Sequence, residues 1–63
     1  MMSNNDWMMN LEIAADEVAA LLGKETVQHV LQKYSARSIE DLSPYYYSEA
    51  FDELNFIAND ARD

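Results

Sequence analysis

The chain has 63 residues, no cysteine and one histidine, and twelve acidic against four basic residues give it a net charge of −8. This size allows one small domain without a large catalytic pocket, and the composition excludes disulfides and cysteine-based or two-histidine metal sites. The charge excludes a non-specific nucleic-acid binder, and a hydrophobic content of 49% is too high for a disordered acidic tail.

No segment suggests export or membrane insertion. The longest nearly apolar run is Val18–Leu22, far short of the roughly 20 residues that span a bilayer. The residues before Asp6 include no basic residue, so they do not resemble a signal peptide. We expect a cytoplasmic protein without membrane contact, because anionic lipid surfaces repel an acidic chain.

A first helix is predicted over residues 6–22. Apolar residues recur there at steps of three and four, namely Trp7, Leu11, Ala14, Val18 and Leu22. Asn5 or Asp6 is the expected N-cap, because a short side-chain oxygen accepts from the free amides of the first turn. Gly23 is expected to end the helix, since glycine takes a left-handed conformation freely.

A second helix is predicted over residues 24–34, followed by one short helical turn over residues 39–42. The helix carries apolar side chains at positions i, i+3, i+4 and i+7, namely Val27, Val30, Leu31 and Tyr34. It is too short to be stable alone, so packing must hold it. The turn is indicated by Ser38 and Asp41, which have the spacing of a capping box.

A third helix is predicted over residues 44–61. Ser43 is a favoured N-cap, and Pro44 suits the first helical position because it has no amide hydrogen to satisfy. Seven apolar residues fall within about 120° of arc on this helix. They are Tyr47, Ala50, Phe51, Leu54, Ile57, Ala58 and Ala61.

These elements predict an all-α fold, a small three-helix bundle over residues 1–63 with a short extra helical turn before the third helix. Short connectors place neighbouring helices antiparallel or crossed. The expected core consists of Trp7, Leu11, Val18, Leu22, Val27, Val30, Leu31, Tyr34, Ile39, Leu42, Tyr47, Phe51, Leu54 and Ile57.

The third helix carries two aromatic residues on the side opposite its core stripe. With Tyr47 at 0°, Tyr45 and Phe56 fall at about 160° and 180° at 100° per residue. Acidic residues surround them, and residues 40–63 contain seven acids and one base. The predicted partner-binding residues are Tyr45, Glu49, Asp52, Glu53, Phe56 and Asp60. The alternative is an ordinary solvated face with two incidental aromatics.

The first helix carries a second apolar stripe opposite the first, formed by Met9, Ile13 and Ala20. Two stripes require cover on both sides of the helix. Either the helix is central in the monomer, or the second stripe mediates self-association, which is a common source of buried area for a small chain.

No catalytic or metal-binding arrangement is predicted, and no cofactor. His29 is expected on the surface, where Glu25 is its one local acidic neighbour, and such a pair is typical of a solvent contact. The acids lack the alternating oxygens and central glycine of an EF-hand loop, and one glycine in the chain cannot form a glycine-rich phosphate loop.

Residues 17–23 and the helix after them resemble a helix-turn-helix in their Ala…Gly spacing over about 20 residues. Lys24 and His29 depart from the motif, because they stand where it has apolar residues. The would-be recognition helix offers only these two residues and Lys33 to DNA, on a chain of net charge −8.

The sequence therefore predicts a small, acidic, non-enzymatic protein-interaction module that binds a basic protein partner through its third helix. An inhibitor or antitoxin-like protein of bacterial or phage origin fits this size and charge. The alternatives are a DNA-mimic inhibitor of a nucleic-acid enzyme, of the anti-restriction or anti-CRISPR type, a helix-turn-helix regulator, and a structural small subunit. Direct nucleic-acid binding is disfavoured, and a homo-oligomer remains an option.

Overall fold

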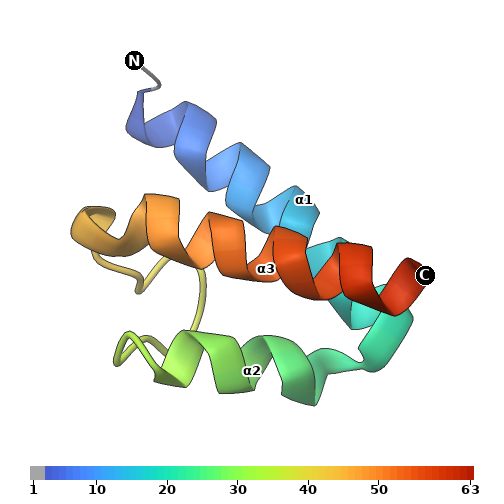
Figure 1. The fold of residues 1–63 in the computed structure, drawn as a ribbon. Coiled ribbons are helices and arrows are strands. Elements are labelled where there is room, and N and C mark those ends of the chain that lie inside the picture. Colours follow the sequence, from blue (N-terminus) through green and yellow to red (C-terminus); the bar gives the residue numbers. More distant parts are fainter. Residues whose placement is uncertain (1–2) are drawn as a thin grey trace.

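The computed structural model describes residues 3–63, so Met1 and Met2 of the predicted domain 1–63 lie outside the described residues. Four helical elements follow one another: α1 (Asn4–Leu22), α2 (Lys24–Gln32), the 3-10 helix η1 (Pro44–Tyr46) and α3 (Tyr47–Arg62). Residues 3–63 contain no strand. The predicted all-α fold, three helices with a short helical turn before the third, is confirmed (Figure 1).

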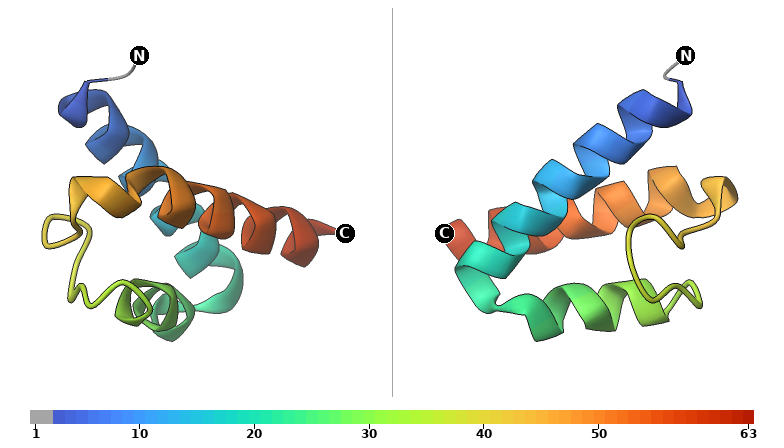
Figure 2. Two further views of the ribbon diagram at one scale, coloured as in Figure 1. Left: turned by 60° about the vertical axis from the view of Figure 1, so that its left-hand side comes forward. Right: turned by 180° about the vertical axis from the view of Figure 1, so that it is seen from behind.

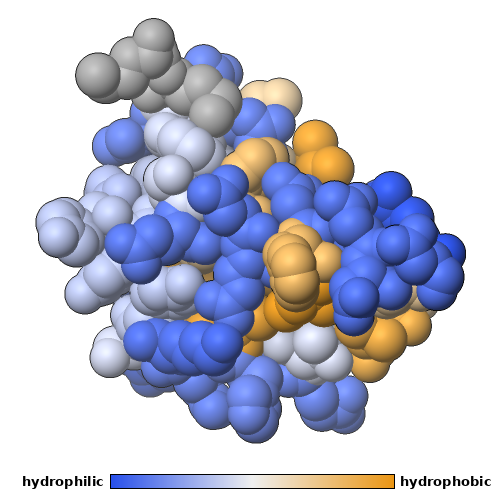
Figure 3. Space-filling model, viewed as in Figure 1, coloured by the Kyte–Doolittle hydropathy of each residue, from blue (hydrophilic) through white to orange (hydrophobic). Residues whose placement is uncertain are grey.

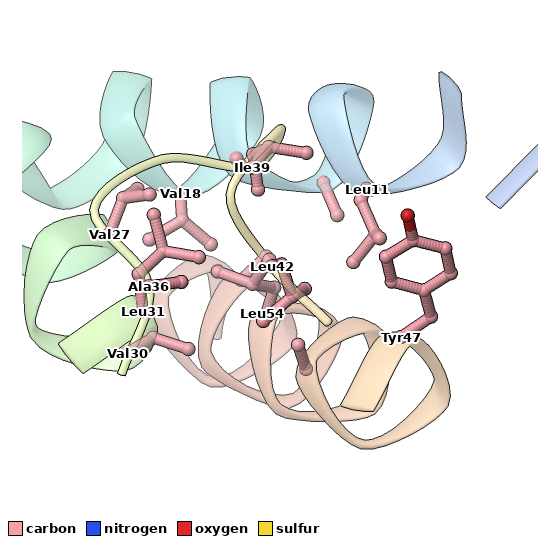
Figure 4. Close-up of a cluster of buried hydrophobic side chains, with 14 residues drawn as sticks. Leu11, Val18, Val27, Val30, Leu31, Ala36, Ile39, Leu42, Tyr47 and Leu54 are labelled. Carbon is pink, nitrogen blue, oxygen red and sulfur yellow. The ribbon is translucent and has the colours of Figure 1, made fainter. Parts of the chain in front are cut away.

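The three helices surround one core. α2 and α3 lie side by side and run in opposite directions, while α1 crosses α3 obliquely (Figures 1 and 2). The connector between α2 and η1 folds back toward the helices and adds Ala36, Ile39 and Leu42 to the core (Figure 4). The most deeply buried side chains are Leu11, Val18, Leu31 and Leu54.

Aromatic side chains join α1 to α3 at one end of the core. Trp7 packs edge-on against Phe51 with ring centroids 5.7 Å apart, and its ring lies 6.5 Å from that of Tyr47. Toward the other end of α3, Arg62 forms an ion pair with Glu17 of α1. Both ends of α3 are therefore tied to α1.

The predicted core is wrong at Leu22, which is 49% exposed. Its phase points inward, but it is the last residue of α1 and the chain turns away immediately after it. Five alanines are buried although none was in the predicted core: Ala14, Ala15, Ala36, Ala50 and Ala58. Four predicted core residues are only partly buried: Trp7, Tyr34, Phe51 and Ile57.

The N-cap of α1 is Ser3, which corrects the prediction of Asn5 or Asp6. The Ser3 hydroxyl accepts a hydrogen bond from the Asp6 amide at 3.2 Å, so both predicted residues lie within the first turn. At the other end the prediction holds: Gly23 ends α1 with φ of 96°, a conformation that glycine adopts without a Cβ clash.

α2 ends at Gln32, two residues before the predicted end. The Ala36 amide donates to the Leu31 carbonyl and the Ser35 amide to the Gln32 carbonyl, both at 3.1 Å. This bonding pattern is a Schellman motif, and Ser35 occupies its left-handed position with φ of 58°. No glycine marks the end of this helix, so the sequence pattern did not locate it.

We expect Ser35→Gly to stabilise the protein by about 1 kcal/mol, because a left-handed conformation costs an L-residue about 1–2 kcal/mol and glycine very little. Urea denaturation measures this change. Gln28→Gly, at the exposed centre of α2, is the control and should lose about 0.5–1 kcal/mol. A loss of stability in both variants would contradict the left-handed turn.

The connector forms the predicted turn before the third helix. The Asp41 amide donates to the Ser38 hydroxyl at 3.3 Å, and the Leu42 amide donates to the Ile39 carbonyl at 3.1 Å. Ser43 then caps the next element, as expected, by accepting from the Tyr45 amide. That element is the 3-10 helix η1, so α3 begins at Tyr47 rather than at residue 44.

Candidate functional site

One exposed aromatic stands at the middle of the outward side of α3. Phe56 is 72% exposed. Helical periodicity places Asp52 and Asp60, each four residues away, directly beside it, and Glu49 one turn further on. These acids are also exposed, and we call the four residues Glu49, Asp52, Phe56 and Asp60 the outer face of α3.

The basic residues near α3 are turned away from this face. Arg62, the one base in residues 40–63, pairs with Glu17 on the α1 side. On the α2 side, Lys33 pairs with Glu53 at 2.5 Å. Both pairs are partly exposed, so each adds little to stability. Their consequence is electrostatic, since Lys33 and Arg62 are engaged by acids that do not belong to the outer face.

Glu53 was predicted as a partner-binding residue, but the structure places it at the boundary between α3 and α2. It is half-buried and accepts hydrogen bonds from Lys33 and from the Tyr34 hydroxyl at 2.9 Å. Partial burial of its carboxylate opposes ionisation, but the two hydrogen bonds and the Lys33 charge outweigh burial and lower its pKa. Glu53 therefore links the two helices.

The pKa of Tyr34, whose hydroxyl donates to Glu53, is raised to about 12. Burial is the largest cause, followed by the hydrogen bond to Glu53 and by the negative charges of Glu53 and Glu49. The folded protein therefore keeps this phenol neutral over a pH range in which the unfolded chain ionises it.

We expect a stability loss at alkaline pH that depends on Tyr34. Its pKa rises on folding from 10.0 to about 12, so its contribution is complete below pH 10 and is lost as pH rises toward 12. Urea denaturation across that range should show a steeper fall in unfolding free energy for the parent than for Tyr34→Phe. Parallel pH curves for the two proteins would contradict the raised pKa of Tyr34.

Tyr45 is 81% exposed, but it does not lie on the same face of the same α-helix as Phe56. It lies in η1, where three residues make a turn instead of 3.6, so the helical-wheel angle assigned to it does not apply. Its ring packs edge-on against Tyr46 at 5.0 Å, and Tyr46 packs against Tyr34 at 5.1 Å. Tyr45 thus extends a tyrosine cluster between η1 and the segment that follows α2.

A groove of about 350 Å³ runs between α2 and α3. Val30 and Ile57 provide its apolar lining, and the ion pair of Lys33 and Glu53 also borders it. The remaining lining residues come from α2: Glu25, Thr26 and His29. The sequence does not reveal this groove, because its lining depends on how two separate helices are placed. Figure 3 shows an apolar spot over the middle of α3 that continues toward α2 between hydrophilic side chains.

The second stripe of α1 is not covered by the rest of the described chain. Met9 is 62% exposed, Ile13 is 65% exposed and Ala20 is also exposed, so of the two alternatives the central, fully covered first helix is excluded for the described residues. The charged residues of α1 are four acids and no base. Acidic side chains therefore flank this stripe along the helix.

Two features speak against the helix-turn-helix alternative. Gly23 alone connects α1 to α2, whereas the motif uses a turn of about three or four residues. In addition, Lys33, one of the few bases that the second helix could offer to DNA, is paired with Glu53.

Within residues 3–63 no group of three or more histidine or acidic side chains is arranged to hold a metal ion. None of the helices in this part of the chain combines the length and apolar character that a membrane crossing requires.

Comparison with protein-family models, curated proteins and solved structures gave no match.

Proposed function

We propose that this chain is a non-enzymatic interaction module that binds a basic protein partner through the outer face of α3. The observation that carries the proposal is Phe56, a large aromatic side chain 72% exposed among acids. An aromatic anchor inside a charged rim is the usual composition of a binding hot spot.

The charge of the outer face supports a cationic partner. Glu49, Asp52 and Asp60 are exposed, whereas Lys33 and Arg62 pair with Glu53 and Glu17. Such a rim accelerates encounter with a basic surface and repels acidic ones. An inhibitor or antitoxin-like role fits this chemistry, because both act by occupying a surface of another protein.

The test begins with capture of a partner from a lysate of the source organism on the immobilised chain. Association rates are then measured for the double variant Asp52→Asn with Asp60→Asn. We expect slower association and a weaker dependence on salt, because rim charges act mainly on the encounter rate. The control is Glu12→Gln with Asp16→Asn on α1, which removes the same charge from a different face. Equal effects of the two pairs would contradict a local site.

The DNA-mimic alternative gives a different result in the same assay. A mimic relies on its whole acidic surface, so both double variants would weaken binding and the salt dependence would be steep. An aromatic anchor would then contribute little, and Phe56 substitutions would leave the affinity unchanged.

Self-association through α1 is the second candidate, because Met9 and Ile13 are exposed. In such a dimer, each copy would present the same acid-flanked stripe to the other. We therefore expect added salt to strengthen the dimer, because it screens the repulsion between these acids. Sedimentation of the parent and of Ile13→Gln tests this: a dimer favoured by salt in the parent and lost in the variant would support it. A parent that stays monomeric at high concentration and high salt would exclude it.

A further inference from the structure

The groove between α2 and α3 adjoins the outer face of α3. Ile57 lines the groove and directly follows Phe56, while Glu53, one turn before Phe56, borders the groove with Lys33. The groove and the exposed ring therefore form neighbouring apolar surfaces. Figure 3 shows the same continuity, with apolar surface over α3 extending toward α2.

The dimensions of this surface suit a helix. The lining of the groove extends from Glu25 in α2 to Lys33, the residue directly after α2, which corresponds to about 12 Å at 1.5 Å per residue. Side chains three or four residues apart on a helix stand about 5–6 Å apart. Two apolar residues of a bound helix could thus occupy the groove and cover Phe56 together.

The charges around the groove select a cationic occupant. Glu25 lies on its α2 side. On α3, at 100° per residue, Asp60 falls between Ile57 and Phe56 around the helix, and Asp52 falls beyond Phe56. A helix in the groove therefore meets acids on its α2 side and on its α3 side. Lys33, the one lysine or arginine in the lining, is engaged by Glu53.

Other occupants fit less well. A second copy of the chain carries a charge of −8 and four bases, of which Lys33 and Arg62 are already paired. Nucleic acids and anionic membranes are repelled by the same acids. The volume of about 350 Å³ lies at the lower limit for a small-molecule pocket.

We propose that the α2–α3 groove receives an aliphatic side chain of a cationic amphipathic helix, and that such a helix is the binding element of the partner. This inference rests on the proposed function and specifies its partner. Recognition follows the helix-in-groove mode, with apolar anchors at i and i+3 or i+4 and cations on the flanks.

Two synthetic helical peptides of equal lysine and arginine content test the inference. One carries leucines along a single face, and the other carries glutamines at those positions. We expect the leucine peptide to bind at least about tenfold more tightly, because it buries an aliphatic side chain. In NMR spectra of the complex, its leucine methyl groups should show NOEs to the methyl groups of Ile57 and Val30.

Ile57→Gln should lower the affinity for the leucine peptide toward that of the glutamine peptide. Ile13→Gln, the same substitution on the exposed stripe of α1, is the matched control and should leave the affinity unchanged. Ile57 is half-buried, so circular dichroism must first show that its variant folds. If the Ile57→Gln variant does not fold, the NOEs in the complex of the parent protein decide whether the leucines occupy the groove.

The remaining outcomes separate the two proposals. Equal affinity of both peptides, with changes confined to the outer face of α3, would overturn the groove and leave the proposed function standing. NOEs from the leucines to Ile13 instead of Ile57 would overturn both, and so would the absence of binding by either peptide.

Discussion

Replacing Leu54 by alanine is expected to destabilise the protein by about 2–5 kcal/mol. The Leu54 side chain is fully buried in the core between the helices, and its removal leaves a cavity that the small bundle cannot easily close (Figure 4). A domain of this length has a total stability of about 5 kcal/mol, so the variant can unfold at room temperature. Thermal and urea denaturation followed by circular dichroism measure the loss.

Leu21→Ala is the matched control, because Leu21 is 42% exposed on α1. Its expected loss is about 1 kcal/mol or less. Phe51→Ala should fall between the two, since Phe51 is only half-buried although it lies on the same stripe as Leu54. If Leu54→Ala melts within a degree or two of the parent, the phase assigned to α3 is wrong.

Phe56→Ala is expected to weaken partner binding by about 1–3 kcal/mol with little change in melting temperature. The ring is 72% exposed, so its removal takes little packing from the folded chain. A partner would bury the ring, and its loss would remove the central anchor of the outer face. Titration calorimetry with the captured partner and a thermal melt of the same sample provide both quantities.

Phe51→Ala makes the same chemical change on the inner side of α3, where the ring packs against Trp7. Phe51→Ala should show the opposite pattern: the fold should be less stable, but at temperatures where the variant is folded its affinity for the partner should be unchanged. A Phe56→Ala variant that melts several degrees lower and binds like the parent would assign the ring to the fold rather than to an interface.

The helices could be predicted because each carries a local apolar period bounded by a capping or breaking residue. The phase of α3 is a clear case: the same pattern that buries Leu54 turns Phe56 outward, as the structure shows. Errors arose where the local signal is weak. Ser35 takes a left-handed conformation without being glycine, and Leu22 has an inward phase but lies at a helix end that nothing covers.

The site was less accessible to prediction, because much of it depends on contacts between distant segments. Glu53 looked like one more exposed acid until α2 placed Lys33 and Tyr34 against it. Tyr45 was assigned an α-helical angle that the 3-10 geometry of η1 does not provide. The groove is invisible in the sequence, since no single helix contains its lining.

An NMR footprint of the captured partner on the isotope-labelled chain tests the central claim most directly. The proposal that α3 binds a basic protein predicts the largest shifts at the Phe56 ring and at the amides of residues 52–60, with the Met9 and Ile13 methyl groups unchanged. The largest shifts at Met9 and Ile13, with the Phe56 ring unaffected, would contradict it and assign the working surface to α1.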